Sequence, residues 1–241
     1  MAASVDAVLK VRRHQPTRLE GFVDASFAFA VTLLVISIGR MPTSVSEMLA
    51  ALRDVPTFAA CFLLIARLWR SHRDWSRHYD LDDAGAVRLS LLLVFLVLIY
   101  VYPLRILFSL MFSSLSGGWL AEHAVGIGTV FELRAAFVVF GIGGLSIWSV
   151  FALLYRHAEK QHAAIGLSAA ERLVTRMSIR RNVVFASIAL LSIALAATLP
   201  FAQRPATIWL PGLAYLLLIP AAAQVRRGAA RELQALTAAS S

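Results

Sequence analysis

Asp24 is an ionisable residue one helical turn inside a long apolar stretch of the sequence. A carboxylate at membrane depth is costly unless it is paired or hydrated, so Asp24 is a candidate for ion or proton binding, or for a structural ion pair. Arg18 lies six residues earlier, about 120° around a helix, and is badly placed to pair with it. We therefore expect a partner on a neighbouring helix, with three candidates: Arg67, His72 and Arg105.

The same stretch carries a second pattern. Side chains spaced alternately four and three residues apart form what we call the seam: Phe22, Ser26, Phe29, Leu33 and Ile36. This spacing places them along one line of a helix, as in a coiled coil. Asp24 lies about 200° around the helix from Phe22 and therefore points off the seam. The seam predicts tight packing against other helices, and it can line a pore only if several copies surround one axis.

The composition indicates which elements hold these residues. Of 241 residues, 59% are hydrophobic and 15% are charged, with a mean hydropathy of +0.72. Soluble domains carry roughly 45–50% apolar and about 25% charged residues, so this chain is too poor in charge to cover a water-exposed surface. We expect an all-α integral membrane protein. Six stretches reach the roughly 20 apolar residues of a spanning helix: 20–39, 49–69, 89–112, 135–155, 183–201 and 207–225.

The positions of the basic residues predict the orientation. The formal net charge is +9, and most of the 23 Lys and Arg residues precede the first stretch, separate the second from the third and the fourth from the fifth, or follow the sixth. In a six-span protein these four segments share one side, which the positive-inside rule places in the cytoplasm with both termini. The surplus is then an orientation signal that also attracts anionic lipid headgroups. We expect no nucleic-acid partner.

Motifs of enzymes and metal sites are missing from the sequence. It contains no Gly-x-Ser-x-Gly elbow, no phosphate-binding loop and no His-Glu-x-x-His pattern. None of the six histidines is three or four residues from another, so no helix face offers two imidazole ligands. A potassium filter of the Thr-Val-Gly-Tyr-Gly kind is also absent. We expect no enzymatic activity, no cofactor and no metal site.

Several local signals predict how the helices begin and pack. Thr17-x-x-Glu20 and Ser168-x-x-Glu171 fit capping boxes, the second at the start of an amphipathic helix over 166–182 that leads into the fifth span. Pro103 is expected to kink the third span. Three glycines in the fourth span predict a close approach of two helices: Gly141, Gly143 and Gly144.

The first span resembles a known family. The segment RLEGFVDASFAFAVTLLV, residues 18–35, is similar to the opening helix of the prokaryotic relatives of the endolysosomal potassium channel, the transmembrane protein 175 family. The hallmark of that family is Arg-x-x-x-Phe-Ser-Asp, matched here by Arg18, Phe22 and Asp24. Trp69-x-x-His72 at the end of the second span and Tyr102-Pro103 in the third add to the resemblance.

The resemblance implies a cation channel whose first helix lines the pore. In that family, single-repeat chains assemble as tetramers and bulky apolar side chains form the narrow point of the pore. By position, the constriction residues are Phe29, Leu33 and Ile36, with Thr32 as a nearby hydroxyl. The motif residues Arg18, Phe22 and Asp24, with Trp69 and His72, are expected to brace the helix rather than to line the pore.

Two residues depart from the family pattern: Val23 replaces the motif serine, and Phe29 replaces an isoleucine at the first constriction position. Four phenylalanines at one level would seal the pore or form a stronger dewetting gate. Three alternatives to a channel therefore stay open. They are a non-conducting homologue, a secondary transporter that uses Asp24, and a membrane enzyme built on the polar segment 67–83.

The sequence thus predicts a potassium-selective or cation leak channel, tetrameric, in a bacterial inner membrane. Its partners are potassium or other monovalent cations and the lipid bilayer. Residues 1–17 are expected to form a cytoplasmic N-terminal segment, 18–227 a six-span channel-like domain and 228–241 a cytoplasmic tail.

Overall fold

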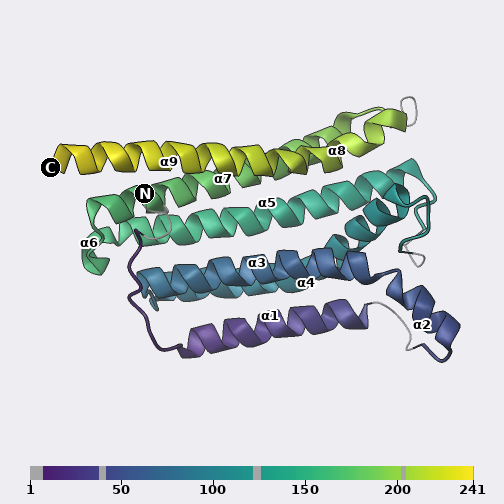
Figure 1. Cartoon of the computed structure of the whole chain (residues 1–241), viewed down its shortest axis with the longest axis horizontal. Coiled ribbons are helices and arrows are strands. Elements are labelled where there is room, and N and C mark those ends of the chain that lie inside the picture. The colour runs from purple at the N-terminus through teal and green to yellow at the C-terminus, as the bar shows by residue number, and fades with distance from the viewer. Residues whose placement is uncertain (1–7, 38–41, 122–125, 202–204, 241) are drawn as a thin grey trace.

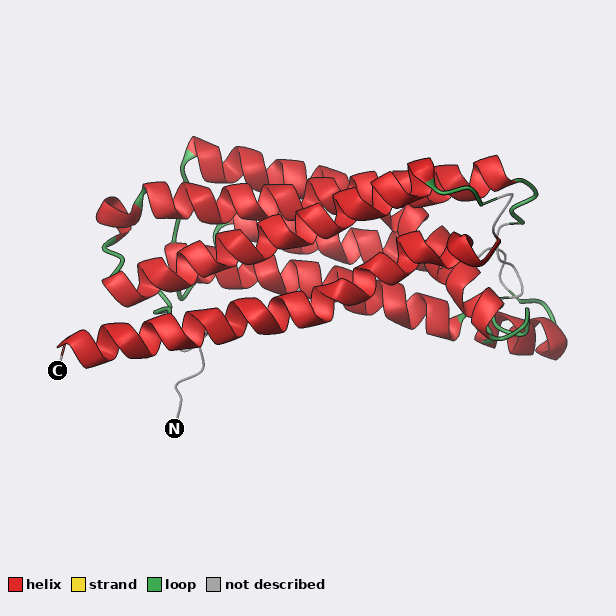
Figure 2. Ribbon diagram, turned by 90° about the horizontal axis from the view of Figure 1, so that it is seen from above, coloured by secondary structure: helices red, strands yellow, loops and turns green. Residues whose placement is uncertain are grey.

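The computed structural model describes residues 8–37, 42–121, 126–201 and 205–240, and its regular elements over these ranges are all helical (Figures 1 and 2). The long helices run side by side along one axis (Figure 1). In chain order the elements are α1 (Arg18–Ile36), α2 (Val45–Leu52), α3 (Val55–Tyr79), α4 (Ala84–Leu115), α5 (Val130–Lys160), α6 (His162–Ile165), α7 (Ala169–Thr198), the 3-10 turn η2 (Pro205–Trp209), α8 (Leu210–Leu213), the 3-10 turn η3 (Ala214–Leu217) and α9 (Leu218–Ser240).

Five segments of the described chain are long and apolar enough to cross a membrane: α1, α4, α5, α7 and Thr207–Leu236. A sixth span is obtained if α2 and α3, which meet at 47°, are taken together. The expected all-α membrane fold is confirmed at this level. The end of the first expected span, at residue 39, lies outside the described residues.

The second expected span, 49–69, is not one continuous helix. The structure breaks it between α2 and α3, and α3 continues for ten residues past Trp69 to Tyr79. Pro56 stands in the first turn of α3. Proline lacks the N–H of the helical ladder, and its ring clashes with the carbonyl four residues earlier, here that of Leu52 at the end of α2, so α2 cannot run straight into α3.

Side-chain caps begin the helices where the sequence predicts them. Thr17 and Glu20 form a complete capping box at the start of α1, and Ser168 and Glu171 form another at the start of α7. The amphipathic segment expected over 166–182 is the first part of α7 and is continuous with the fifth span.

The long helices alternate in direction along the bundle axis. α1, α4 and α7 begin, and α3, α5 and α9 end, at one end of the bundle, which also carries the described N-terminal residues 8–17; we call it the basic end (left in Figure 1). α1 lies along one edge of the bundle and α9 along the opposite edge (Figure 1).

The glycines of α5 allow the close helix contacts that the sequence predicts. A Cβ atom on Gly143 would lie 2.2 Å from the Tyr100 ring of α4, and one on Gly141 would lie 2.5 Å from Ile193 of α7. Both distances are far inside van der Waals contact, so a larger residue must separate the helices.

Gly143→Ala should therefore destabilise the bundle by about 1–3 kcal/mol, the usual cost of overpacking a core. Thermal unfolding in detergent measures the effect. Gly228→Ala in α9 is the matched control, because no atom lies within 4 Å of its added Cβ and alanine favours a helix over glycine. Equal midpoints for the two variants would contradict the packing described for α5.

Candidate functional site

Helix α1 contacts the bundle through one narrow stripe. Val23, Phe27, Ala30 and Leu34 are at most 4% exposed, and α1 packs on α3 and α4. Their spacing of four, three and four residues places them on one line of the helix. Val23, which replaces the motif serine, belongs to this stripe, so its apolar side chain lies among apolar neighbours of the core cluster.

The seam lies beside this stripe and is not the packing surface of the single chain. Phe22 and Phe29 are each 54% exposed and Ile36 is 65% exposed, while Ser26 and Leu33 are partly buried. At 100° per residue the centre of the seam is about 110° from the centre of the stripe. On the single chain the seam therefore does not make the tight packing against other helices that the sequence predicts. α1 instead presents a row of bulky side chains outward.

The hydroxyl groups of Ser26, in the seam, and of Thr32, beside it, donate to backbone carbonyls of α1. Thr32 is exposed and its Oγ1 donates to the Ala28 carbonyl at 3.1 Å. Ser26 Oγ donates to the Phe22 carbonyl at 2.7 Å. Each hydroxyl proton is used inside the helix, so each oxygen keeps a lone pair directed outward that can accept from water or contact a cation.

Asp24 is bonded to Trp69 rather than to a charged residue. The Trp69 indole Nε1 donates to Asp24 Oδ1 at 2.7 Å, which joins α1 to α3. The guanidinium carbon of Arg73 lies 5.5 Å above the Trp69 ring, within the range of a cation–π contact. The expected ion pair is wrong: within the described residues, none of Arg67, His72 and Arg105 is bonded or ion-paired to Asp24, although the Asp24 charge acts on the nearby His72.

The other expected bracing residues divide into two groups. His72 is 2% exposed, and its Nε2 lies 2.9 Å from Ser90 Oγ, which ties α3 to α4 one turn from Trp69. Arg18 and Phe22 are both exposed. The structure thus joins α1 to α3 through Asp24 and Trp69, and α3 to α4 through His72 and Ser90. It leaves Arg18 and Phe22 facing outward on the single chain.

The comparisons with known proteins identify the family. A family model described as "Endosomal/lysosomal potassium channel TMEM175" matches residues 18–103, the part of the chain that holds α1, the α2–α3 pair and α4 up to Pro103. A protein named "Potassium channel" from Marivirga tractuosa is 35% identical over 214 residues, which are 87% of this chain and 85% of that protein. The chain belongs to the TMEM175 family. This family consists of ion channels, so the chain is not an enzyme.

Solved structures of the TMEM175 family have the same fold. A crystal structure of a variant of the potassium channel MtTMEM175, in complex with a nanobody fusion protein, is 32% identical to this chain. The two superpose with a TM-score of 0.79, over 92% of this chain and 97% of that one. A TMEM175 homologue from Chamaesiphon minutus gives a TM-score of 0.56 at 21% identity, over 86% of this chain and 96% of that one, and supports the fold alone.

One part of this TMEM175 chain was not expected to be structural. The sequence predicts residues 8–17 only as part of a basic cytoplasmic segment, yet Arg13 is 7% exposed and has three partners at the basic end. Its guanidinium pairs with the Asp80 carboxylate and donates to Thr17 Oγ1 at 3.1 Å, and its Nη2 lies 3.3 Å from Asp82 Oδ2. Burial lowers the pKa of Arg13, but the hydrogen bond to Asp80 and both carboxylate charges raise it above its ordinary value.

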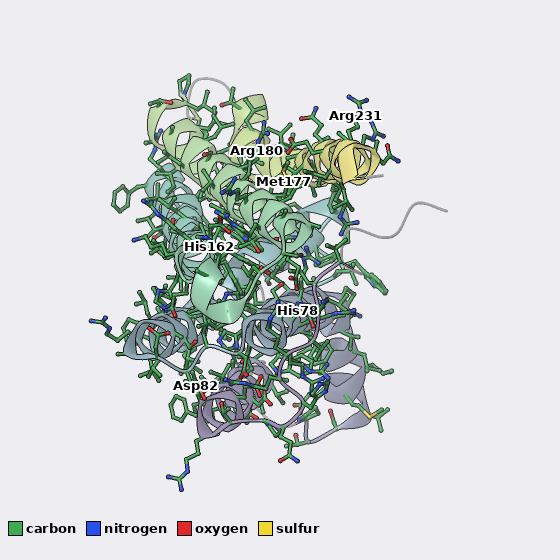
Figure 3. The ribbon with its side chains drawn as sticks, turned by 90° about the vertical axis from the view of Figure 1, so that its left-hand side faces the viewer. His78, Asp82, His162, Met177, Arg180 and Arg231 are labelled. Atoms are coloured by element: carbon green, nitrogen blue, oxygen red, sulfur yellow. The ribbon has the colours of Figure 1, made fainter. Side chains whose placement is uncertain are left out.

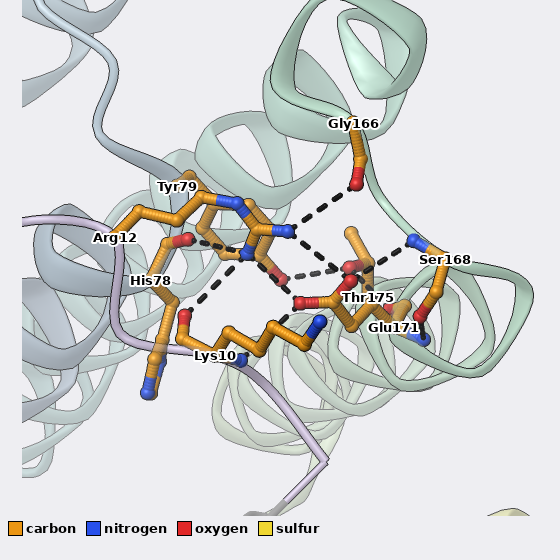
Figure 4. A network of polar contacts seen from close by, with 8 residues as sticks. All are labelled: Lys10, Arg12, His78, Tyr79, Gly166, Ser168, Glu171 and Thr175. Carbon is orange, nitrogen blue, oxygen red and sulfur yellow. Dashed lines mark hydrogen bonds and ion pairs between the residues drawn. The ribbon is translucent and has the colours of Figure 1, made fainter.

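Arg12 makes a second set of contacts with α3 and α7 (Figure 4). Its guanidinium donates to both carboxylate oxygens of Glu171, at 2.9 and 3.1 Å, and to the His78 carbonyl at 3.1 Å. The backbone N–H groups of Arg12 and Arg13 both donate to the Arg77 carbonyl. Residues 8–17, which lead directly into α1, are thus fixed to the ends of α3 and α7. Only their basic character was visible in the sequence, because their partners lie far away along the chain.

Arg13→Ala should release this segment. We expect the backbone amides of Arg12 and Arg13 to exchange with deuterium at least about ten-fold faster, which corresponds to ~1.4 kcal/mol of lost local stability. Hydrogen–deuterium exchange of the purified protein measures it. Arg70→Ala is the control, because the Arg70–Asp74 pair is exposed and 3.7 Å apart and such pairs contribute little. Unchanged exchange in Arg13→Ala would show that the segment is held by other contacts.

Proposed function

We propose that this protein is a potassium-selective channel in which four copies of α1 surround a central pore, lined by the seam residues Phe29, Leu33 and Ile36. One observation carries the proposal: α1 buries a single stripe in its own chain and exposes the row Phe22, Phe29 and Ile36 beside it. The match of residues 18–103 to the potassium channel family, and the potassium channel names of two relatives, support potassium as the ion.

A single chain cannot enclose an axis with one copy of α1. The helix lies at the edge of the bundle (Figure 1), so copies of the chain can meet through it without displacing any other helix. Homo-oligomers usually close as rings, and the family resemblance implies four subunits. The tetramer would place four side chains of Phe29, Leu33 and Ile36 at successive levels of the pore.

The proposed pore selects by dehydration. Apolar rings offer an ion no replacement for its water, so passage through them is limited by loss of part of the hydration shell. Potassium holds its water less tightly than sodium and passes at lower cost. The Thr32 oxygen, with its hydroxyl proton bonded to Ala28, lies one residue from Leu33 and would contact the ion beside the apolar rings.

In this proposal Asp24 braces α1, because its carboxylate accepts the hydrogen bond from Trp69. The bond from Trp69 to Asp24 holds α1 on α3 on the side away from the seam, and the bond between His72 and Ser90 fixes α3 on α4. Arg18 and Phe22 are exposed in one chain, and we propose that they contact a neighbouring subunit. In this account Asp24 does not touch the permeating ion.

The orientation is part of the same proposal. The α2–α3 pair counts as one of six spans, and the basic end, which holds residues 8–17 and the end of α9, faces the cytoplasm of a bacterial inner membrane.

Ion flux from purified protein in liposomes tests the function. The liposomes hold potassium inside, and a membrane-permeant cation outside balances the charge that leaves. We expect more potassium efflux than from empty liposomes. When sodium replaces potassium inside, the efflux of the cation should be lower. Native mass determination should give four chains. A monomer, or equal fluxes of the two ions, would contradict the proposed potassium-selective pore.

A further inference from the structure

Large apolar side chains are exposed at the end of the bundle where α1, α4 and α7 finish, which we call the distal end. The basic end, by contrast, carries charged side chains, among them Arg180 and Arg231 in the view along the bundle (Figure 3). At the distal end, where α4 ends and α5 begins, four exposed side chains are apolar: Leu115, Trp119, Val130 and Phe131. Exposed apolar surface of this kind marks contact with a membrane or with protein.

α2 adds an apolar face of its own to the distal end (Figure 1). Four side chains that are between 47% and 70% exposed form what we call the α2 face: Val45, Met48, Leu49 and Leu52. Their spacing of three, one and three residues places them within about 100° of the helix circumference. The partly buried residues of α2, Ala50 and Ala51, lie about 160° from the centre of this face. The α2 face therefore points away from the helices of its own chain.

α2 needs a partner for this face. It has eight residues, and none of them is buried within the chain. Isolated helices shorter than about 12–15 residues are marginal in water, and most helices are stabilised by packing of their apolar side. Two contacts cap the start of α2: Ser44 Oγ accepts from the Glu47 N–H at 3.2 Å, and the Glu47 carboxylate accepts from the Thr43 hydroxyl at 2.8 Å. These contacts fix where α2 begins, but they leave its apolar face uncovered.

The length of α3 indicates the depth at which α2 lies. Residues 55–66 of α3 precede its first basic residue, Arg67. They rise ~18 Å along the helix, whereas the hydrocarbon core of a bilayer is roughly 30 Å thick. The α2–α3 pair, taken as the sixth span, must therefore use the residues before α3 to reach the far boundary of the core. This places α2 where the hydrocarbon core meets the headgroups.

Trp119 indicates the same level from a neighbouring segment. The Arg53 guanidinium carbon lies 5.8 Å from the centroid of the Trp119 ring, and the Ala121 N–H donates to the Arg53 carbonyl at 3.2 Å. Arg53 directly follows α2, so these contacts join the turn after α4 to the end of α2. Trp119 is itself exposed, and exposed tryptophan is typical of the boundary between membrane and water.

We propose that α2 is an interfacial helix and that the α2 face inserts among the lipid acyl chains at the boundary of the bilayer. The chain is a multi-pass membrane protein, and the face is apolar and carries no charge. α2 lies beyond the end of α1 along the bundle (Figure 1), so copies of the chain that meet through α1 need not cover it. An interfacial helix buries its apolar side by about 5–10 Å. This contact requires neither the proposed pore nor its orientation.

Spin labels on α2 test the proposal in full-length protein reconstituted into liposomes of palmitoyl-oleoyl phosphatidylcholine. Met48→Cys carries the label on the α2 face, and Ser46→Cys is the matched control, about 160° around the helix and also exposed. The native Cys61 is buried, so the wild type gives the labelling background. Molecular oxygen concentrates in hydrocarbon, and the neutral nickel complex NiEDDA stays in water. The ratio of oxygen to nickel collision rates should be at least about five-fold higher for Met48→Cys, whose side of an interfacial helix is buried.

The angle between α2 and α3 gives a second readout. Because the two helices meet at 47°, Leu52 lies about 7 Å deeper than Val45 toward the middle of the bundle. The same ratio should therefore rise from Val45→Cys to Leu52→Cys.

Three outcomes would overturn the proposal. Equal nickel collision rates for Met48→Cys and Ser46→Cys would place the α2 face in water. Low rates with both reagents at Met48→Cys would show that protein covers the face, as a second copy of the chain would do. A ratio that falls from Val45→Cys to Leu52→Cys would contradict the depth given to α2. Thermal unfolding of each labelled variant shows that it is folded.

Discussion

Phe29→Ala should raise potassium flux through the reconstituted protein by about ten-fold or more. In the proposed tetramer, four Phe29 side chains meet at one level of the pore and form its first apolar ring. Removing four phenyl groups widens the ring, so an ion keeps more of its water as it passes. A ten-fold rise corresponds to a barrier lower by ~1.4 kcal/mol. Discrimination between potassium and sodium should fall at the same time, because it arises from the same dehydration.

Val35→Ala is the matched control for this prediction. Val35 and Phe29 are exposed to nearly the same extent in the single chain, 51% and 54%. Val35 lies about 120° around α1 from Phe29 and off the seam. Flux through Val35→Ala should therefore equal that of the wild type. If Phe29→Ala and Val35→Ala change the flux equally, or if Phe29→Ala leaves it unchanged, the assignment of the constriction to the seam is wrong.

The second large effect concerns the bond between Asp24 and Trp69. Trp69→Phe keeps an aromatic ring but removes the indole N–H that donates to Asp24. A hydrogen bond to a charged group contributes about 1.5–3 kcal/mol, and an unpartnered carboxylate at membrane depth adds its own cost. We expect a loss of about 2 kcal/mol in stability, measured by thermal unfolding, and a smaller tetramer fraction in native mass spectra.

Asp24→Asn distinguishes this bracing role from ion or proton transport by Asp24. The asparagine side-chain oxygen still accepts the Trp69 hydrogen bond, so the variant should fold, assemble and conduct much as the wild type does. A transporter that binds its ion or proton at Asp24 would lose transport with the charge. Loss of flux in a folded, tetrameric Asp24→Asn protein would contradict the channel account and favour the transporter.

Helix starts and close helix contacts could be predicted from the sequence, because the residues that fix them lie in or next to the helix concerned. Polar caps at Thr17 and Ser168 fix where α1 and α7 begin, and the glycines of α5 mark its close contacts with α4 and α7. The break between α2 and α3 was missed, although Pro56 was available as a signal. Arg53 and Asp54 also interrupt the apolar run at this point, but the stretch 49–69 still has the length of one spanning helix.

The packing face of α1 could not be predicted from periodicity. The seam and the buried stripe both repeat every four and three residues, and both are rich in bulky apolar side chains. Which of the two rows packs depends on the side chains of α3 and α4 that face α1, and the sequence of α1 does not contain these. The partner of Asp24 was missed for a chemical reason: the prediction considered only groups that carry a positive charge, whereas a neutral indole donor satisfies the carboxylate.

Cysteine accessibility tests the central claim, that the seam of α1 lines the pore, most directly. Ile36 and Val35 are neighbours in sequence, are 65% and 51% exposed in the single chain, and point about 100° apart. The native Cys61 is buried and should not react. We predict that a cationic methanethiosulfonate reagent blocks potassium current through Ile36→Cys and leaves that through Val35→Cys unchanged. Block of Val35→Cys without block of Ile36→Cys would contradict the account.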